Sequence, residues 1–168
     1  MKESILNGKT ILAVDDESDV LAILEEELRH ECPKCTFDKA STFEEASQKL
    51  SSNKYDLVIL DIMGVRGFDL LKRAAIQKRP VAMLTAHAFT PDALKRSIEL
   101  GARAYLPKEM LGEIIPFLED ILTYEYLSGW NRLLRKFERF FKFRWGEYWK
   151  MPEELFWKEL DKKTNDIK

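Results

Sequence analysis

Apolar residues follow two different spacings along the first 125 residues of the chain. Five short runs are mostly apolar and rich in β-branched or aromatic residues, which is typical of strands: 10–14, 36–37, 57–60, 81–84 and 104–106. Four segments between these runs carry apolar residues at the spacing of one helix face: 20–28, 43–50, 68–71 and 94–100. Regular alternation of strands and helices predicts a parallel α/β sheet.

A fifth helix is expected after the last of these strands. It should begin near Glu113, because Gly112 breaks the preceding segment and Pro116 is tolerated only in the first turn of a helix. Four apolar residues would then face the sheet: Phe117, Leu118, Ile121 and Leu122. Residues 1–126 thus form a (βα)5 unit, a doubly wound five-stranded parallel sheet of ordinary domain length.

Residues 127–168 have a different composition and contain all four tryptophans of the chain. On a helical wheel, eight apolar or aromatic side chains share one arc: Trp130, Leu133, Leu134, Phe137, Phe140, Phe141, Trp145 and Tyr148. The opposite face is basic, with Arg132, Arg135, Lys136, Arg139 and Lys142. We predict a separate C-terminal helical extension, in which Gly146 and Pro152 end or kink one long amphipathic helix and residues 153–160 form a short last one.

The wide aromatic face of this extension needs something to cover it. Our first interpretation is that it packs on the first domain or, preferably, on the same face of a second subunit in a homodimer. A basic face opposite bulky aromatic residues also fits a helix that lies on an anionic membrane surface. Nucleic acid ranks third, and no specific nucleic acid is expected, because no helix-turn-helix pair is evident and one basic helix attracts nucleic acid only non-specifically.

Charge and apolar content give the chain no other obvious partner. It has 27 basic and 29 acidic residues, so its net charge does not attract nucleic acid or an anionic surface. The first ten residues lack the apolar stretch of a signal peptide, and no run of about 18 apolar residues could span a membrane. We expect a soluble, cytoplasmic protein.

The only two cysteines, Cys32 and Cys35, are spaced C-P-K-C. A zinc site usually needs four ligands, and a thioredoxin-type motif should open a helix, whereas this pair follows a predicted helix and precedes a strand. We interpret Cys35 as a small buried strand residue, with a reactive pair as the alternative.

Residues able to do chemistry follow four of the five predicted strands. Asp15 and Asp16 follow the first strand, Asp61 follows the third, Thr85 follows the fourth, and Lys108 comes just after the fifth. The carboxyl ends of parallel strands share one edge of the sheet, so these side chains should meet there. Taken singly, each has an ordinary structural role, such as capping a helix. Three carboxylates together repel one another unless a cation lies among them, which indicates Mg²⁺.

Such a cluster suits transfer of a phosphoryl group to a carboxylate. Asp61 is the best nucleophile, because it ends the central apolar strand, and Asp15 and Asp16 would hold the metal. Thr85 and Lys108 would bind the oxygens of the phosphoryl group.

The motifs V-D-D at 14–16, L-D at 60–61, T-A at 85–86 and A-Y-L-P-K at 104–108 resemble those of the CheY-like receiver domain of response regulators. The resemblance covers residues 8–125 and implies a flavodoxin/CheY-like strand order of 2-1-3-4-5. It also implies Mg²⁺-dependent transfer of phosphate to Asp61 from a histidine kinase or phosphotransfer protein, followed by hydrolysis. Such a protein is a phosphoryl acceptor rather than a turnover enzyme.

The resemblance further assigns roles to three features of this sequence. The backbone carbonyl of Met63 becomes a Mg²⁺ ligand, and Thr85 and Tyr105 become a switch in which Tyr105 changes rotamer. The fourth helix, fifth strand and fifth helix become the output surface and a second candidate for dimer contacts. From the sequence alone, Tyr105 could equally be a packed residue of an edge strand.

Two segments depart from the family pattern. Residues 61–67 form a loop about two residues shorter than usual and without proline. Proline precedes the lysine, as Pro107, and Glu109 follows it, where most receivers place a proline that is often cis. A cis bond between Lys108 and Glu109 would cost about 2.5–4 kcal/mol, so we expect it to be trans.

Two other functions fit the same sequence less well. A scaffold that acts through the extension without phosphorylation would not need all of Asp15, Asp16, Asp61, Thr85 and Lys108. A phosphatase-like hydrolase needs a general base outside the cluster, and only His87 stands near it. We interpret His87 instead as a loop residue that adjusts dephosphorylation.

Overall fold

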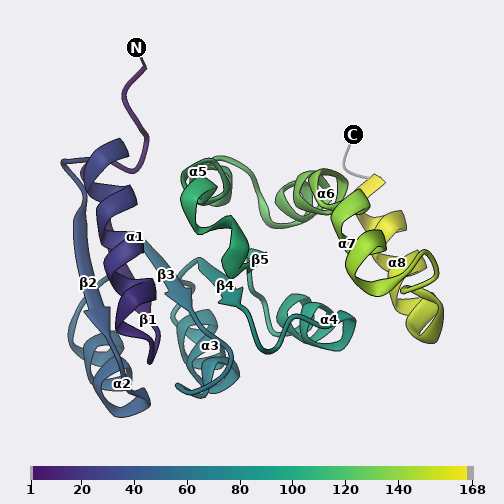
Figure 1. The fold of residues 1–168 in the computed structure, drawn as a ribbon, viewed down its shortest axis with the longest axis horizontal. Coiled ribbons are helices and arrows are strands. Elements are labelled where there is room, and N and C mark those ends of the chain that lie inside the picture. Colours follow the sequence, from purple (N-terminus) through teal and green to yellow (C-terminus); the bar gives the residue numbers. More distant parts are fainter. Residues whose placement is uncertain (1, 166–168) are drawn as a thin grey trace.

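The computed structural model describes residues 2–165, in which five parallel strands form one sheet. The sheet order is β2-β1-β3-β4-β5, which confirms the expected fold class and strand order (Figure 1). The strands are β1 Thr10–Val14, β2 Thr36–Ala40, β3 Leu57–Leu60, β4 Val81–Thr85 and β5 Ala104–Pro107. All residues of β3 and β4 are buried, because helices cover both faces of a doubly wound sheet.

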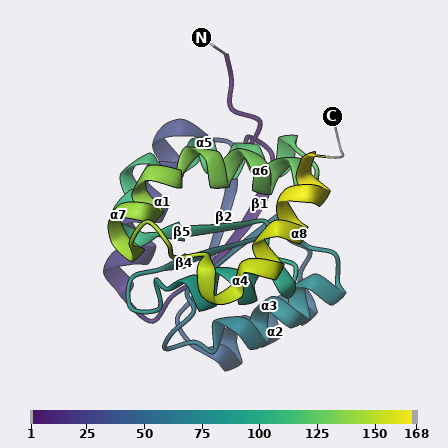
Figure 2. The same cartoon turned by 90° about the vertical axis from the view of Figure 1, so that its right-hand side faces the viewer.

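Five helices connect and cover these strands. They are α1 Ser18–Glu31, α2 Phe43–Ser52, α3 Gly67–Ile76, α4 Pro91–Glu99 and α5 Ile115–Thr123. Helices α1 and α5 lie on one face of the sheet, and α2, α3 and α4 lie on the other (Figure 2). Helix α5 begins two residues later than expected, because Lys108–Glu113 forms the 3-10 helix η1 first, while Pro116 lies in the first turn as predicted.

Cys32 and Cys35 lie in the turn between α1 and β2. The interpretation of Cys35 as the buried strand residue was wrong: Cys32 is fully buried at the end of α1, whereas Cys35 precedes β2 and is half-buried. The backbone N–H of Cys35 donates to the carbonyl of Cys32, and the two sulfur atoms lie 3.5 Å apart. The turn therefore holds both thiols side by side.

The C-terminal extension, or tail, consists of α6 Tyr126–Lys136, α7 Glu138–Trp145, the 3-10 helix η2 Met151–Glu153 and α8 Glu154–Asn165. The predicted helix ends at Gly146, whose φ is +89°, but it is not continuous, because it breaks at Phe137. Phe137 is buried and stacks on Phe117 of α5, with ring centroids 5.1 Å apart. Packing against the first domain thus overrides the helical periodicity.

The aromatic face of the tail packs on the first domain, which was one of the alternatives. The tail lies at the β5 edge of the sheet, with α6 against α5 and β5 (Figure 1). Trp130 is fully buried, and its indole N–H donates to the carbonyl of Ala102 at 2.8 Å. Tyr148 departs from the prediction, because its side chain is 72% exposed. Helices of the same chain therefore cover the edge strand of this sheet.

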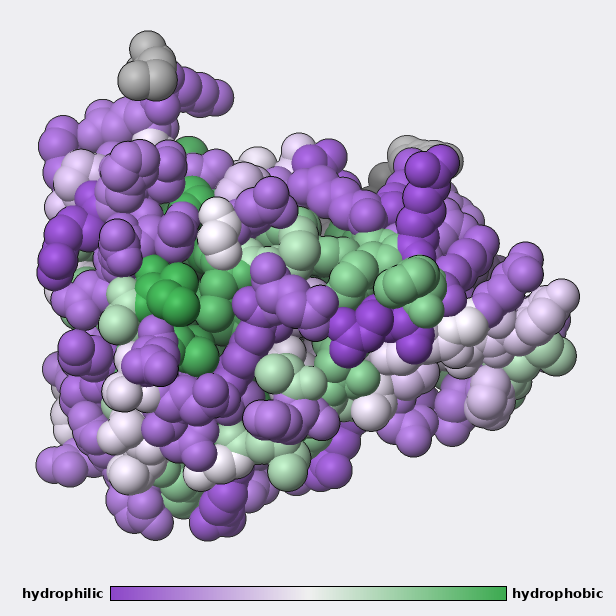
Figure 3. Space-filling model, viewed as in Figure 1, coloured by the Kyte–Doolittle hydropathy of each residue, from purple (hydrophilic) through white to green (hydrophobic). Residues whose placement is uncertain are grey.

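Some basic residues of the tail are neutralised within the molecule. Arg132 and Lys136 pair with Asp120 of α5, at 3.6 and 2.9 Å. Arg144 pairs with Glu109 of η1 at 2.6 Å. Among the described residues, no helix is both long and apolar enough to cross a membrane. Figure 3 shows one side of the whole molecule. Its outline is mostly hydrophilic, and apolar residues gather in a band across the middle.

Candidate functional site

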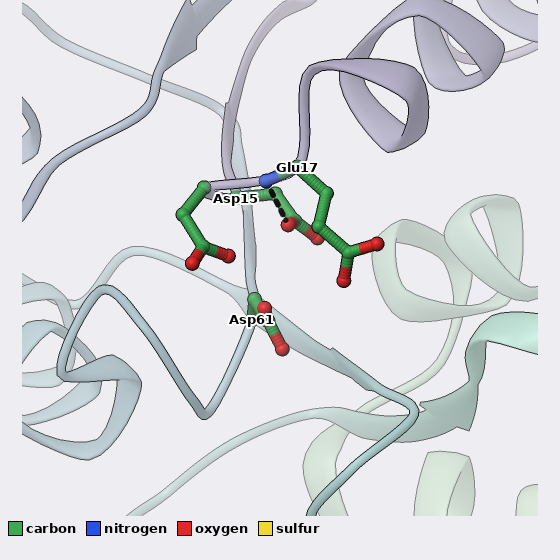
Figure 4. Close-up of side chains that lie close together, drawn as sticks. Asp15, Glu17 and Asp61 are labelled. Atoms are coloured by element: carbon green, nitrogen blue, oxygen red, sulfur yellow. Dashed lines mark hydrogen bonds between the residues drawn. The ribbon is translucent and has the colours of Figure 1, made fainter.

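Asp15 and Asp61 meet because β1 and β3 are neighbours in the sheet. Val14 pairs with Leu60, and the N–H of Asp61 donates to the carbonyl of Val14 at 3.0 Å. Asp15 and Asp61 come directly after these two strands, and both are buried, with 2% and 4% of their surfaces exposed. Figure 4 shows their carboxylates on the same side of the strand ends, together with that of Glu17.

Four acidic residues form the cluster: Asp15, Asp16, Glu17 and Asp61. One carboxylate oxygen of each lies within 4.8 Å of the others. Asp16 and Glu17 are exposed, so they lie on the solvent side of the buried pair. Glu17 was not among the predicted site residues, although its position directly after two aspartates was a signal. Its backbone N–H also donates to Asp15 Oδ1 at 2.9 Å (Figure 4).

Lys108 joins three of these carboxylates. Its Nζ lies 2.9 Å from Asp15 Oδ2, 2.9 Å from Glu17 Oε1 and 3.2 Å from Asp61 Oδ2. Burial opposes its charge, but hydrogen bonds to Asp15 and Glu17 and the charge of Asp61 raise the pKa of Lys108 above its ordinary value. Lys108 therefore stays protonated and offsets part of the negative charge.

The two buried aspartates resist ionisation more than ordinary carboxyl groups do. Burial, reinforced by the nearby charge of Asp15, raises the pKa of Asp61 to about 6, although Lys108 opposes this effect. Burial also raises the pKa of Asp15 above its ordinary value. One lysine thus does not fully offset the cost of placing two carboxylates together, and an additional cation would stabilise their ionised forms.

The donor set fits a hard divalent cation. Asp15 Oδ2 is buried, and its contact is with the ammonium group of Lys108 at 2.9 Å, with no further partner among the described residues. Carboxylate oxygens are ligands that Mg²⁺ prefers. Asp15, Asp16 and Asp61 lie together as predicted for metal ligands. Met63 lies in the following loop with its side chain 53% exposed, and the role of its carbonyl stays a prediction.

Two glycines allow the short loop after Asp61 to pass close to the cluster. Gly64 has a φ of +83°, and a Cβ there would overlap the carboxylate of Asp16. A Cβ on Gly67 would overlap the backbone carbonyl of Asp61. The shortened loop is therefore compatible with the acidic cluster only because these positions have no side chain.

Thr85 lies at the end of β4, and its side chain is hydrogen-bonded to the loop of residues 86–90, here called the β4–α4 loop. Its Oγ1 accepts a hydrogen bond from the N–H of Ala88 at 3.1 Å. Tyr105 of β5 is fully buried, and its hydroxyl donates to the carbonyl of Ala88 at 2.8 Å and accepts from the N–H of Thr90 at 2.9 Å. The two residues of the predicted switch therefore contact the same loop.

His87 is exposed in the β4–α4 loop. Its electrostatic effect helps to lower the pKa of Glu17, after the larger effects of Lys108.

The peptide bond between Lys108 and Glu109 is trans, as expected, because no peptide bond between described residues is cis. Lys108 reaches the cluster without the proline that usually follows this lysine.

Residues 11–115 match the family model described as the response regulator receiver domain. The chain is 37% identical over 109 residues to the two-component response regulator ARR12 of Arabidopsis thaliana. It is 36% identical over 107 residues to the alkaline phosphatase synthesis transcriptional regulatory protein PhoP of Bacillus subtilis. Each match covers 60% of this chain but only 17% of ARR12 and 42% of PhoP. The chain thus spans less than half the length of either relative.

Solved structures show the same likeness over the sheet and its helices. A response regulator from Chloroflexus aurantiacus is 32% identical, with a TM-score of 0.60, and the match covers 69% of this chain and 98% of that one. The response regulator TrrA from Thermotoga maritima, solved in complex with Mg²⁺-BeF, is also 32% identical, with a TM-score of 0.57. That match covers 68% of this chain and 97% of TrrA.

Proposed function

The chain belongs to the response regulator receiver domain family, and from that premise we propose that Asp61 accepts a phosphoryl group within a two-component system. The donor class is a histidine kinase or phosphotransfer protein, as the response-regulator relatives suggest. The observation that carries the proposal is the position of Asp61. It lies at the buried end of the central strand, within 3.2 Å of Lys108 and among three other carboxylates.

The transfer uses the ionised form of Asp61. With a pKa of about 6, the carboxylate is largely deprotonated at neutral pH. One of its oxygens attacks the phosphorus of a phosphohistidine, the P–N bond breaks, and its electrons stay on the ring nitrogen, which leaves as neutral imidazole because the other ring nitrogen carries a proton. Lys108 offsets charge on the phosphoryl oxygens. Water later hydrolyses the acyl phosphate, which restores Asp61 and releases inorganic phosphate.

We propose Mg²⁺ as the cofactor. Asp15, Asp16 and Asp61 would hold it, with the carbonyl of Met63 as a further ligand. The ion supplies positive charge to the transferring phosphoryl group. The buried Asp15 Oδ2, which has Lys108 as its one partner among the described residues, supports this assignment, and so does the Mg²⁺-BeF complex of the similar protein TrrA.

The remaining roles follow from the same proposal. The hydroxyl of Thr85 would donate a hydrogen bond to a phosphoryl oxygen. Tyr105 would change rotamer in response, through the β4–α4 loop that both residues contact. The protein would act as a cytoplasmic phosphoryl acceptor rather than as a turnover enzyme. The division at 126/127 falls just inside α6, which begins at Tyr126, so we propose that the tail starts with this helix.

Intact-protein mass spectrometry tests the proposal. Incubation with acetyl phosphate and Mg²⁺ should add one phosphoryl group, and Asp61→Asn should abolish the addition. Omission of Mg²⁺ should slow it strongly. Glu26→Gln is a control, because Glu26 is exposed on α1, outside the acidic cluster and away from the tail. Equal phosphate uptake by the wild type and Asp61→Asn would refute the assignment of the acceptor.

A further inference from the structure

The β4–α4 loop lies between the candidate site and the tail, and Phe89 is its central contact. Phe89 is 92% removed from solvent, with only 8% of its surface exposed. On one side its ring stacks on Tyr105, with centroids 5.3 Å apart and an interplanar angle of 13°. On the other side it packs on Trp145 of α7, with centroids 4.7 Å apart. Phe89 thus connects the predicted switch to the tail.

Hydrogen bonds from side chains to the loop backbone strengthen this connection between the predicted switch and the tail. The indole N–H of Trp145 donates to the carbonyl of Phe89 at 3.2 Å. The preceding residue of the loop, Ala88, donates to Thr85 Oγ1 and accepts from the hydroxyl of Tyr105. Thr85 is therefore hydrogen-bonded to Ala88, and Trp145 is hydrogen-bonded to Phe89, the next residue of the same loop.

The aromatic contacts continue through the tail. Trp145 stacks on Phe141 at 4.7 Å, Phe141 packs on Trp149 at 5.6 Å, and Trp149 packs on Trp157 of α8 at 4.9 Å. Phe141, Trp149 and Trp157 are all buried. We call this set, from Phe89 to Trp157, the aromatic row. Each ring of this row packs directly on the next one. Displacement of Phe89 should therefore disturb the packing of α7 and, through Trp149 and Trp157, that of α8.

Ion pairs fix the tail on both sides of the loop. Arg144 pairs with Glu109 at 2.6 Å, immediately after Lys108, and its guanidinium also lies over the ring of Phe89. Lys95 of α4 pairs with Glu153 of η2 at 3.1 Å. The tail therefore contacts the segments that follow both β4 and β5, the strands that end at Thr85 and just before Lys108.

We propose that the tail stabilises the unphosphorylated form and is loosened when Asp61 is phosphorylated. This inference rests on the proposed function. In the present arrangement Thr85 Oγ1 is bonded to Ala88. When Thr85 turns toward a phosphoryl group on Asp61, this hydrogen bond would break and the β4–α4 loop would move, which would take Phe89 from its place against Tyr105 and Trp145. The tail contacts the β4–α4 loop in its present position, and phosphorylation would favour a different position of this loop. Contact with the tail and phosphorylation must therefore oppose each other by the same free energy.

Hydrogen exchange on the full-length chain tests the first half of this relationship. Beryllofluoride with Mg²⁺, used as a mimic of the phosphoryl group, should speed amide exchange in α7 and α8 several-fold, and Asp61→Asn should show no such change. Phosphate uptake from acetyl phosphate is measured on the same preparation without beryllofluoride. Absence of uptake would refute the proposed function, whereas uptake with unchanged or slower exchange in the tail would refute only the coupling.

The Trp145→Leu variant tests the reciprocal half. Loss of the contact with Phe89 should tighten the binding of beryllofluoride with Mg²⁺ about fivefold, the effect of a coupling near 1 kcal/mol. Phe143→Leu is the matched control, because Phe143 lies on the same helix but is 85% exposed, and its affinity should equal that of the wild type. Circular dichroism establishes that both variants are folded. An unchanged or weaker affinity in folded Trp145→Leu would overturn the coupling.

Discussion

Lys108 Nζ lies 3.2 Å from Asp61 Oδ2, although the two residues are 47 positions apart in the sequence. The contact forms because β3 and β5 both end at the same edge of the sheet, with β4 between them. The same ammonium group lies nearer to Asp15, at 2.9 Å. Lys108 thus serves the acidic pair as a whole rather than Asp61 alone.

Replacement of Lys108 by methionine should impair both phosphate uptake and ionisation of the cluster. Without the ammonium group, Asp15 and Asp61 keep only their mutual repulsion, so the pKa of Asp61 should rise above about 6. We expect uptake from acetyl phosphate to fall at least about tenfold, because a charge that offsets the phosphoryl oxygens is lost. Lys158→Met is the control, since Lys158 is exposed in α8, where it pairs with Glu154 of the same helix. An uptake rate near that of the wild type would contradict the role of Lys108.

A methyl group at Gly64 should weaken Mg²⁺ binding. The added Cβ overlaps the carboxylate of Asp16, and the φ of +83° adds backbone strain of about 1–3 kcal/mol. Gly8→Ala separates the two effects, because Gly8 has a φ of +81° but open space around its Cβ. Calorimetric titration with Mg²⁺ should show weaker binding for Gly64→Ala and unchanged binding for Gly8→Ala. Equal affinities would show that Asp16 does not depend on the space at Gly64.

Trp130→Phe should destabilise the whole molecule. The substitution leaves the carbonyl of Ala102 without its buried donor and opens a cavity between α6 and the β5 edge. We expect a loss of about 2 kcal/mol in the free energy of unfolding, measured by urea denaturation. Tyr148→Phe, at an exposed position of the tail, should change this free energy by less than about 0.5 kcal/mol. A stable Trp130→Phe variant would mean that α6 contributes little to the fold.

Cys32 should resist alkylation in the folded protein. Burial, followed by the hydrogen bond with Cys35, raises the pKa of the Cys32 thiol to about 12. Since this pKa exceeds that of an ordinary thiol, the neutral form is favoured by folding, and stability falls as the pH rises from about 9 to 12. At pH 8, iodoacetamide should modify the half-buried Cys35 first, as peptide mass mapping can determine. Faster modification of Cys32 would favour the alternative of a reactive pair.

The sequence predicted the acidic cluster well because topology alone brings its members together. Asp15 and Asp61 each follow a short apolar strand, and parallel strands place their carboxyl ends at one edge whatever the details of packing. Glu17 was missed because membership depended on its side chain turning back to Lys108 at 2.9 Å, which strand order does not specify.

The break at Phe137 could not be predicted from local pattern. No glycine or proline marks it, and residues 130–145 keep one helical period throughout. The break depends on Phe137 stacking on Phe117, a contact between segments whose relative positions only the folded structure defines. The same limit applies to Phe89, whose importance comes from lying between Tyr105 and Trp145. An isolated phenylalanine in a loop gives no sign of such a role.

The aromatic row also gives this protein a built-in optical reporter. All four tryptophans belong to the tail, and residues 1–126 contain none, so light absorbed by indole is emitted only from the tail. The ring centroids of Trp145 and Trp149 lie 5.2 Å apart and those of Trp149 and Trp157 lie 4.9 Å apart, so emission depends on how these rings are packed. The proposed phosphorylation of Asp61 should therefore change tryptophan emission, and the unlabelled protein would report it in real time from the tail.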